Sequence, residues 1–286
     1  MTTFAVMIRT NFHTHSLFCD GKDTIEAFVK AALEHDFQRL GFSGHAPVPI
    51  DNGFAIRSGS LQNYCDSVRQ NQQKYKDQIE VFLGLEADFI PGVTIPFNEL
   101  RESCGLDYII GSVHLVSNKE SGELWFIDGP DRDIYDLGMK NLFGDDIRAA
   151  VSAYFEQVKT MIQQERPDIV GHIDKIKMHN NERFFSTSDK WYSDLMIEVL
   201  EASAEIGAIV EVNPRGVYKG RCEELFPGKE WLPLMKEMGI QVMLNSDAHH
   251  PDDLMKEYHS SLDAIRKAGY MKLAVWSKNG LEEVEI

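Results

Sequence analysis

The chain has 286 residues, enough to bury a core as one large domain or two small ones. With 43% hydrophobic and 26% charged residues, its composition is that of a soluble globular protein and not of a disordered chain. The net charge of −16 argues against a basic surface for nucleic acid or anionic membranes, although bound divalent cations would still attract a phosphorylated ligand.

Apolar runs typical of β-strands alternate along the chain with stretches of helical spacing. In the first such stretch, Thr24 can cap a helix whose apolar face begins with Ile25 and Phe28. Segments 46–59 and 117–146 are rich in Gly, Pro, Asp and Asn, and we expect long loops there. Further helices are predicted over 60–77, 96–103, 147–166, 188–206, 229–238 and 251–268.

This alternation predicts an α/β protein in which crossover helices join parallel strands. Seven strand–helix units can be counted, and 272–276 is only a weak candidate for an eighth. A closed barrel fits better than an open sheet, because a barrel gathers all of its strand ends around one mouth. We find no internal repeat and no linker, so the sequence predicts a single TIM-like (β/α)7 barrel domain over 1–286.

Cysteine usage and the N-terminal segment bear on the compartment. The cysteines form no CxxC pair, so neither a thiolate zinc site nor a disulfide framework is predicted. The N-terminal segment lacks a basic start followed by a long apolar stretch, which a signal peptide would have. No run reaches the roughly 18 apolar residues of a membrane span. We therefore expect a cytoplasmic protein, with no membrane partner.

The strand-like runs share one feature, since each ends on a residue that can bind a metal. Two residues of a strand that are two positions apart point to the same side, so His13 and His15 can reach one ion. A carboxylate directly after VFLGL would be costly to bury without a cation, and Glu86 could bridge two ions. The residues at the strand ends are His13, His15, His45, Glu86, His114, His172, Asn213, Asp247 and His249.

Taken singly, these residues also have ordinary interpretations. The pair His13 and His15 could be two polar residues on a strand, and Asp20 could belong to a turn beside a helix cap. His45 and His172 could be buried histidines whose ring nitrogens are satisfied within the core. The recurrence at successive strand ends favours a metal site over these alternatives.

Other polar residues close to the ends of the predicted strands are expected to have other roles. Asp88 and Asp174 could orient the ligands through hydrogen bonds, although Asp174 could equally cap a helix. Of the remaining histidines, His250 is expected to face away from the site or to support a ligand, whereas His35, His179 and His259 are expected to lie at the solvated surface.

The motifs HTHSLFCDG, SGH, GLEAD, GSVH, GHID and NSDAH, in this order, resemble those of the PHP (polymerase and histidinol phosphatase) family. HAPVP, GLEADFIPG and DYIIGSVH narrow the resemblance to its histidinol-phosphatase branch. The resemblance implies a distorted seven-stranded barrel with a trinuclear site of Zn, Mn or Fe. It assigns one ion to His13, His15, Glu86 and Asp247, a second to Glu86, His114 and His172, and a third to Asp20, His45 and His249.

Clustered divalent ions can activate a water, clamp phosphoryl oxygens and stabilise both oxygens of an in-line displacement. The expected activity is therefore hydrolysis of a small phosphorylated substrate, L-histidinol phosphate in histidine biosynthesis, by a metal-activated hydroxide. The proton donor to the leaving group is open between a metal-bound water and Asp247. Alternatives are a phosphoesterase for another small ester or a nucleotide phosphodiester, and a non-catalytic regulatory metal-binding module. An exonuclease is disfavoured by the acidic chain, and the oligomeric state is open.

The basic residues that would hold the phosphate are less evident. Relatives carry an arginine in a segment resembling NTSGLR, whereas this chain has NPRGVYKGR with Tyr218 at that place. Arg215 is the first candidate, because it follows a strand end and a guanidinium fork suits phosphate oxygens. The other candidates are Lys175, Lys177, Lys219, Arg221 and, in a loop that could close over the site, Arg57.

Overall fold

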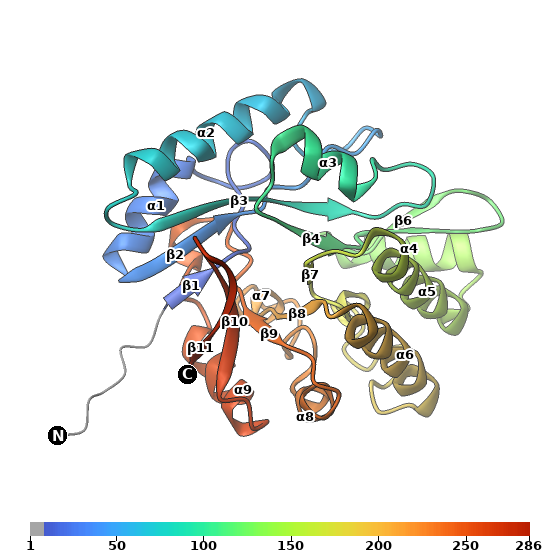
Figure 1. Cartoon of the computed structure of the whole chain (residues 1–286). Helices are drawn as coiled ribbons and strands as arrows, with labels where there is room; N and C mark the ends of the chain where they lie inside the picture. Colours follow the sequence, from blue (N-terminus) through green and yellow to red (C-terminus); the bar gives the residue numbers. More distant parts are fainter. Residues whose placement is uncertain (1–8) are drawn as a thin grey trace.

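A seven-stranded sheet forms the centre of the computed structural model, which describes residues 9–286 (Figure 1). Each strand pairs in parallel with its neighbours. In sheet order the strands are β1 (Arg9–Asn11), β2 (Phe37–Phe42), β3 (Glu80–Asp88), β4 (Tyr108–Ser112), β7 (Ile169–Val170), β8 (Ile209–Val212) and β9 (Val242–Leu244).

The first and last strands meet just beyond their C-terminal ends. A parallel bridge joins Thr14 to Ala248. The His15 N–H donates to the Ala248 carbonyl at 2.9 Å, and the Ala248 N–H donates to the His13 carbonyl at 3.0 Å. The sheet is thus a nearly closed, distorted barrel, which confirms the predicted fold class.

Helices surround this sheet (Figure 1). The first begins as predicted, because the Thr24 hydroxyl accepts a hydrogen bond from the Ala27 N–H at 3.2 Å. The α-helices are α1 (Ile25–Glu34), α2 (Leu61–Lys74), α3 (Phe97–Cys104), α4 (Arg132–Phe143), α5 (Ile147–Glu165), α6 (Lys190–Ile206), α7 (Arg215–Tyr218), α8 (Leu232–Glu237) and α9 (Tyr258–Lys267). Short 3-10 turns are η1 (Ser58–Ser60), η2 (Lys175–Lys177), η3 (Lys229–Trp231) and η4 (Pro251–Asp253).

The expectation of a long loop over 117–146 was wrong. This segment carries most of an antiparallel hairpin, β5 (Leu115–Ser117) with β6 (Leu124–Phe126), and the whole of α4. The hairpin is tied to the helix because the Trp125 indole N–H donates to the Tyr135 carbonyl at 2.9 Å. Trp125 of the hairpin and Tyr135 and Met139 of the helix are buried. In the sequence they belong to short apolar stretches with polar residues on both sides, so no apolar pattern marked them.

Two predictions near the C-terminus differ from the structure in detail. The helix expected over 251–268 begins only at Tyr258, since Pro251–Asp253 forms a 3-10 turn. The weak eighth strand exists as β10 (Lys272–Ser277), but it pairs antiparallel with β11 (Gly280–Glu285) outside the barrel. The barrel therefore has seven strands.

The barrel interior depends on glycines beside Tyr108. Gly84 pairs with Tyr108 in the register of β3 and β4, and Gly41 lies on the neighbouring strand β2. The Tyr108 hydroxyl donates to the Phe12 carbonyl at 2.6 Å, and this bond fixes the ring across the interior. A Cβ atom at position 84 would lie 2.5 Å from the ring and one at position 41 would lie 2.3 Å from the hydroxyl, so both sites require glycine.

We expect Gly84→Ala to destabilise the fold by about 1–3 kcal/mol, because a fully buried tyrosine ring has no space to move away. Gly59→Ala is the matched control, since a Cβ atom there meets nothing within 4 Å. The free energy of unfolding in urea measures both changes. Equal stability of the two variants would contradict the tight packing.

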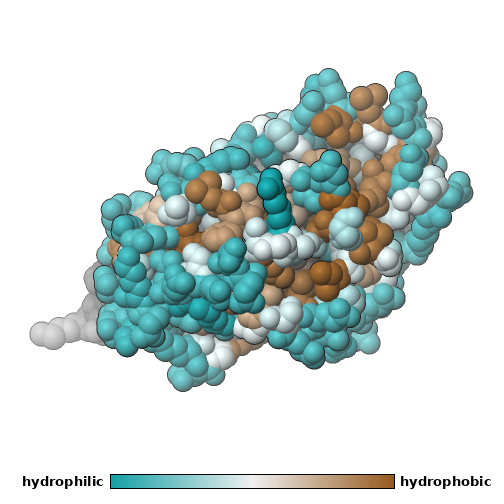
Figure 2. All heavy atoms as spheres, turned by 90° about the horizontal axis from the view of Figure 1, so that it is seen from above, coloured by the Kyte–Doolittle hydropathy of each residue, from teal (hydrophilic) through white to brown (hydrophobic). Residues whose placement is uncertain are grey.

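The surface is polar over much of the face seen from above, with smaller hydrophobic areas between the hydrophilic ones (Figure 2). The most exposed large hydrophobic side chains described are those of Met271, Leu17 and Leu137. Among residues 9–286, no helix is long and apolar enough to cross a membrane.

Candidate metal centre

The C-terminal strand ends converge at one mouth of the barrel, as the sequence predicts. All nine predicted ligands lie there. Eight of them are buried, and the side chain of Asp20 is 27% exposed. Two, His172 and Asp247, have positive φ angles of 21° and 53°, conformations that non-glycine residues adopt mainly where their surroundings impose them.

The first predicted group consists of His13, His15, Glu86 and Asp247. Glu86 Oε2 lies 3.2 Å from His13 Nε2 and 3.5 Å from His15 Nε2. Asp247 Oδ1 lies 3.7 Å and 3.3 Å from the same two nitrogens. Ligand atoms of a tetrahedral ion with bonds near 2.0 Å are roughly 3.3 Å apart, so the distances between each carboxylate and the two imidazoles are close to those that ligands of one ion require.

The second predicted group faces the other oxygen of Glu86. Glu86 Oε1 lies 2.9 Å from His172 Nε2 and 3.4 Å from His114 Nε2. The two imidazole nitrogens are themselves 3.2 Å apart. Glu86 thus directs one carboxylate oxygen to each group, which is the arrangement that a bridging ligand requires.

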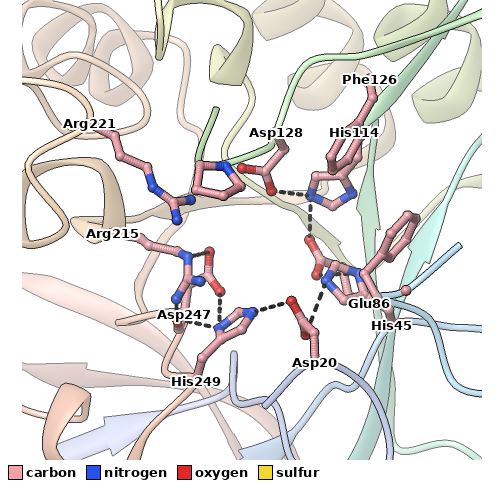
Figure 3. A pocket seen from close by; sticks show the side chains of 13 residues that line it. Asp20, His45, Glu86, His114, Phe126, Asp128, Arg215, Arg221, Asp247 and His249 are labelled. Carbon is pink, nitrogen blue, oxygen red and sulfur yellow. Dashed lines mark hydrogen bonds and ion pairs between the residues drawn. The ribbon is translucent and has the colours of Figure 1, made fainter. Parts of the chain in front are cut away.

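The third predicted group lies nearer the surface. Asp20 Oδ2 is 3.1 Å from His249 Nε2, and Asp20 Oδ1 is 3.8 Å from His45 Nε2. The other nitrogen of His45 faces Glu86 Oε2 at 3.1 Å, and His15 Nδ1 lies 3.6 Å from Asp20. His45 and His15 therefore lie between groups, so the three groups form one continuous cluster. Figure 3 shows the part of this cluster that faces the cavity, with Asp20, His45 and His249 among the labelled residues.

Several nitrogen and oxygen atoms of this cluster that could bind a metal are buried without a hydrogen-bond partner. Buried polar atoms are normally paired, so a concentration of unpaired ones at one place points to a bound cation. Possible ligand atoms lie within 4.8 Å of one another in three overlapping sets, which are His15, Asp20, His45 and His249; His13, His15 and Asp247; and His45, Glu86 and His114. Among the nine predicted ligands, the buried atoms without a hydrogen-bond partner are His13 Nε2, His15 Nε2, His45 Nδ1, His172 Nδ1, Asp20 Oδ1 and Asp247 Oδ1. This nitrogen and oxygen donor set fits divalent metal ions.

The carboxylates of the cluster are ionised at neutral pH. Burial alone would raise the pKa of Glu86, but the neighbouring imidazoles, His13 foremost, lower it well below its usual value. Burial likewise opposes ionisation of Asp247, yet His13 and Arg215 hold its pKa well below the usual range. An ionised Asp247 would first have to take up a proton, so its role as proton donor stays a prediction.

Hydrogen bonds from outside the cluster orient its imidazoles. Asp88 accepts from His114 Nδ1 at 3.0 Å and from the His114 backbone N–H at 2.9 Å, as anticipated. Asp174 lies at the N-cap position of η2, but its side chain makes no capping hydrogen bond and accepts from the Gly228 N–H at 3.0 Å and pairs with Lys177 at 2.8 Å. His179 was wrongly placed at the surface, because it is buried and its ring donates to the Gly129 carbonyl.

Glu211 also belongs to this site, although the sequence did not predict it. This residue of β8 is fully buried and accepts a hydrogen bond from His13 Nδ1 at 2.7 Å. It is two positions before Asn213, the predicted strand end, and strand alternation places both side chains on the barrel interior. That spacing was the available signal.

A cavity of about 290 Å³ opens beside the cluster (Figure 3). Two arginines line it, Arg215, whose Nε lies 3.8 Å from Asp247 Oδ2, and Arg221. Arg215 is held in place because its guanidinium donates to the Asp247 carbonyl at 2.8 Å. Burial opposes its charge, but Asp247 raises the pKa of Arg215 above its usual value. A fixed cation beside a metal cluster suits an anionic ligand.

Three of the other basic candidates, Lys177, Lys219 and Arg57, do not line this cavity. Lys177 is buried between Asp174 at 2.8 Å and Glu224 at 2.9 Å, so its charge is already compensated. Lys219 is paired with Asp253 at 2.9 Å. Arg57 is exposed at the start of η1, away from the cavity lining. We therefore do not retain these three as phosphate ligands.

The remaining wall comes from the two segments that were predicted as loops. Phe54 and Phe126 stack with ring centroids 5.9 Å apart and an interplanar angle of 4°. Asp128 follows β6, and its Oδ2 lies 3.2 Å from the buried Lys175 Nζ. Burial would raise the pKa of Asp128, but Lys175 and other nearby cations lower it to about 2. No sequence pattern marked these three residues.

A family model for the PHP domain matches residues 11–215. The chain belongs to the PHP domain family. Among curated relatives of this PHP domain, the "probable histidinol-phosphatase" of Schizosaccharomyces pombe is 27% identical, with 93% of this chain and 89% of the relative covered. The histidinol-phosphatase of Lactococcus lactis is 23% identical, with 95% of each chain covered.

Solved structures show the same fold. The crystal structure of L. lactis histidinol phosphate phosphatase, a complex with zinc, L-histidinol and phosphate, has a TM-score of 0.69 at 22% identity. It covers 96% of this PHP domain chain and 98% of its own. A Listeria monocytogenes chain has a TM-score of 0.77 at 23% identity, covering 88% and 99%. The distorted barrel and the predicted family are thereby confirmed.

Proposed function

We propose that this PHP domain hydrolyses L-histidinol phosphate to L-histidinol and phosphate, a step of histidine biosynthesis. The observation that carries the proposal is a cluster of buried, unpaired metal-ligand atoms that adjoins a cavity lined by two arginines. The names of the relatives that match almost the whole chain support the same substrate. We also infer that residues 1–286 work as one domain in the cytoplasm.

The proposed cofactor is a set of three divalent ions, Zn, Mn or Fe. When bound, such ions supply a hydroxide at neutral pH and Lewis acid stabilisation of the phosphoryl oxygens. The residues that would hold them are His13, His15, Asp20, His45, Glu86, His114, His172, Asp247 and His249. Glu86 would neutralise two ions, since its two oxygens face different groups.

The phosphate would bind between the cluster and the arginine wall. Arg215 presents a guanidinium whose position is fixed by the Asp247 carbonyl, and Arg221 lines the same cavity. Preorganised cations stabilise the charge of a transferring phosphoryl group without further rearrangement. Arg215 is therefore proposed to orient the ester for in-line attack.

The third wall suits the L-histidinol part of the substrate. Phe54 and Phe126 offer flat apolar surface to an imidazole ring. Among the described residues, Asp128 is the one carboxylate lining this cavity that is not a proposed ligand, and it would face the substrate ammonium. A generic sugar phosphate has neither a ring of this kind nor a cation.

We expect Asp128→Asn to lower kcat/KM for L-histidinol phosphate by about 10-fold or more, because a charge-assisted hydrogen bond is lost. An analogue that lacks the amino group should be affected much less. Asp131→Asn is the matched control, since Asp131 is exposed and caps α4 outside the cavity. An equal loss on both esters would contradict recognition of the ammonium.

Phosphate release from purified protein loaded with Mn or Zn tests the proposed function. The panel pairs L-histidinol phosphate with sugar phosphates, nucleotides and a phosphodiester. A strong preference for L-histidinol phosphate is expected. Turnover only of another ester would move the protein to a different substrate, and a metal-loaded protein without turnover would favour a regulatory module.

A further inference from the structure

Glu211 is a fully buried carboxylate at the base of the metal centre. Its Oε1 accepts from His13 Nδ1 at 2.7 Å and from the Asn245 amide at 3.1 Å. Its Oε2 accepts from the His172 backbone N–H and the Asn213 amide, both at 3.0 Å. These donors follow four different strands, β1, β9, β7 and β8.

The four hydrogen bonds fill the acceptor positions of the carboxylate. Glu211 therefore has no lone pair left for a metal ion and is not itself a ligand. An ionised carboxylate can only accept hydrogen bonds. In the hydrogen bond between His13 and Glu211 the hydrogen is therefore carried by Nδ1 of the imidazole. This leaves the lone pair of His13 on Nε2, the nitrogen that lies 3.2 Å from Glu86 Oε2.

The second contact acts on the backbone. His172 has a φ angle of 21°, which few non-glycine residues adopt, and its N–H is held by Glu211 Oε2. The side chain of His172 points with Nε2 to Glu86 at 2.9 Å. The same glutamate thus fixes one histidine through its ring and another through its main chain.

We infer that Glu211 is a positioning residue that presets His13 and His172 for metal binding, a role that rests on the metal ligands of the proposed function. The network extends one step further, because Asn213 also donates to Asp247 Oδ2 at 3.2 Å. Three proposed ligands of two ions, His13, His172 and Asp247, are therefore tied to one buried carboxylate. Residues that orient metal-bound histidines in this way commonly change metal affinity by about 10- to 100-fold.

Glu211→Gln tests this role, because the amide keeps the size of the side chain but turns an NH₂ group toward donors. We expect the variant to lose metal to a competing chelator at about 10- to 100-fold lower chelator activity than the wild-type protein. Asp168→Asn is the matched control. Asp168 accepts from the Ile109 N–H at 2.7 Å and pairs with Arg101, outside the cluster.

Metal affinity is measured without substrate, so its outcome is separate from that of the phosphatase assay. A wild-type protein that binds no metal would overturn the proposed function and the role of Glu211 together. Equal metal affinity of metal-loaded wild type and Glu211→Gln would overturn only the role of Glu211. A lower affinity in Glu211→Gln but not in Asp168→Asn supports it.

The wild-type protein offers a second test if Glu211→Gln does not fold. Nitrogen NMR of the zinc-loaded protein identifies which ring nitrogen of His13 carries hydrogen. We expect hydrogen on Nδ1 and none on Nε2. Hydrogen on Nε2 of His13 would overturn the inference whatever the variant does.

Discussion

Replacing Glu86 with alanine should remove bound metal and phosphatase activity together. The two oxygens of Glu86 face different groups of donors, at 3.2 Å from His13 and 2.9 Å from His172. Removing one partner of a buried ion pair commonly costs about 3–5 kcal/mol. For Glu86→Ala we therefore expect metal affinity to fall by roughly 100- to 1,000-fold or more. Metal analysis and phosphate release on the same preparation measure both effects.

Glu80→Ala is the control for Glu86→Ala. Glu80 begins the same strand β3 but lies at its far end, where it pairs with Arg39 at 3.2 Å. We expect that variant to keep its metal and its activity. Full activity of Glu86→Ala at unchanged metal content would refute the bridging role.

Replacing Arg215 with alanine should impair catalysis at intact metal content. The guanidinium lines the cavity beside the cluster and donates to the Asp247 carbonyl, so it is positioned before a substrate arrives. Loss of one preorganised group that stabilises transition-state charge commonly costs about 100- to 1,000-fold in kcat. Steady-state kinetics with L-histidinol phosphate, beside metal analysis, would detect the loss in kcat/KM.

Lys219→Ala is the matched control for Arg215→Ala, since Lys219 is a nearby cation that pairs with Asp253 outside the cavity. Its kinetics should equal those of the wild type. If Arg215→Ala keeps its activity, the phosphate contact belongs to Arg221. If Arg215→Ala loses metal, the residue acts through Asp247 and not on the phosphate.

The strand ends could be predicted because two simple regularities coincide there. Apolar runs mark the parallel strands, and a barrel brings their C-terminal ends together, so His114 and His172 had to approach each other although they are 58 positions apart. The ring nitrogens are indeed 3.2 Å apart. Their role as metal ligands is a proposal that the metal analysis above will test.

The cavity wall could not be predicted in the same way. Phe126 ends a hairpin whose strands are only three residues long, too short for a periodic pattern, and Asp128 lies just after it. Lys177 was a false candidate because its partners, Asp174 and Glu224, become neighbours only in the folded chain. Sequence alone identifies a cation but not whether another residue already neutralises it.

The bridge between Thr14 and Ala248 has a consequence for the order in which the protein matures during synthesis. It joins the segments that follow the first and last barrel strands, with His13 and His15 on one side and Asp247 and His249 on the other. A growing chain carries its first two histidines long before it contains Asp247. The centre can therefore be completed only after residues up to His249 have left the ribosome, and a product truncated before residue 247 would lack both the bridge and the last two proposed ligands.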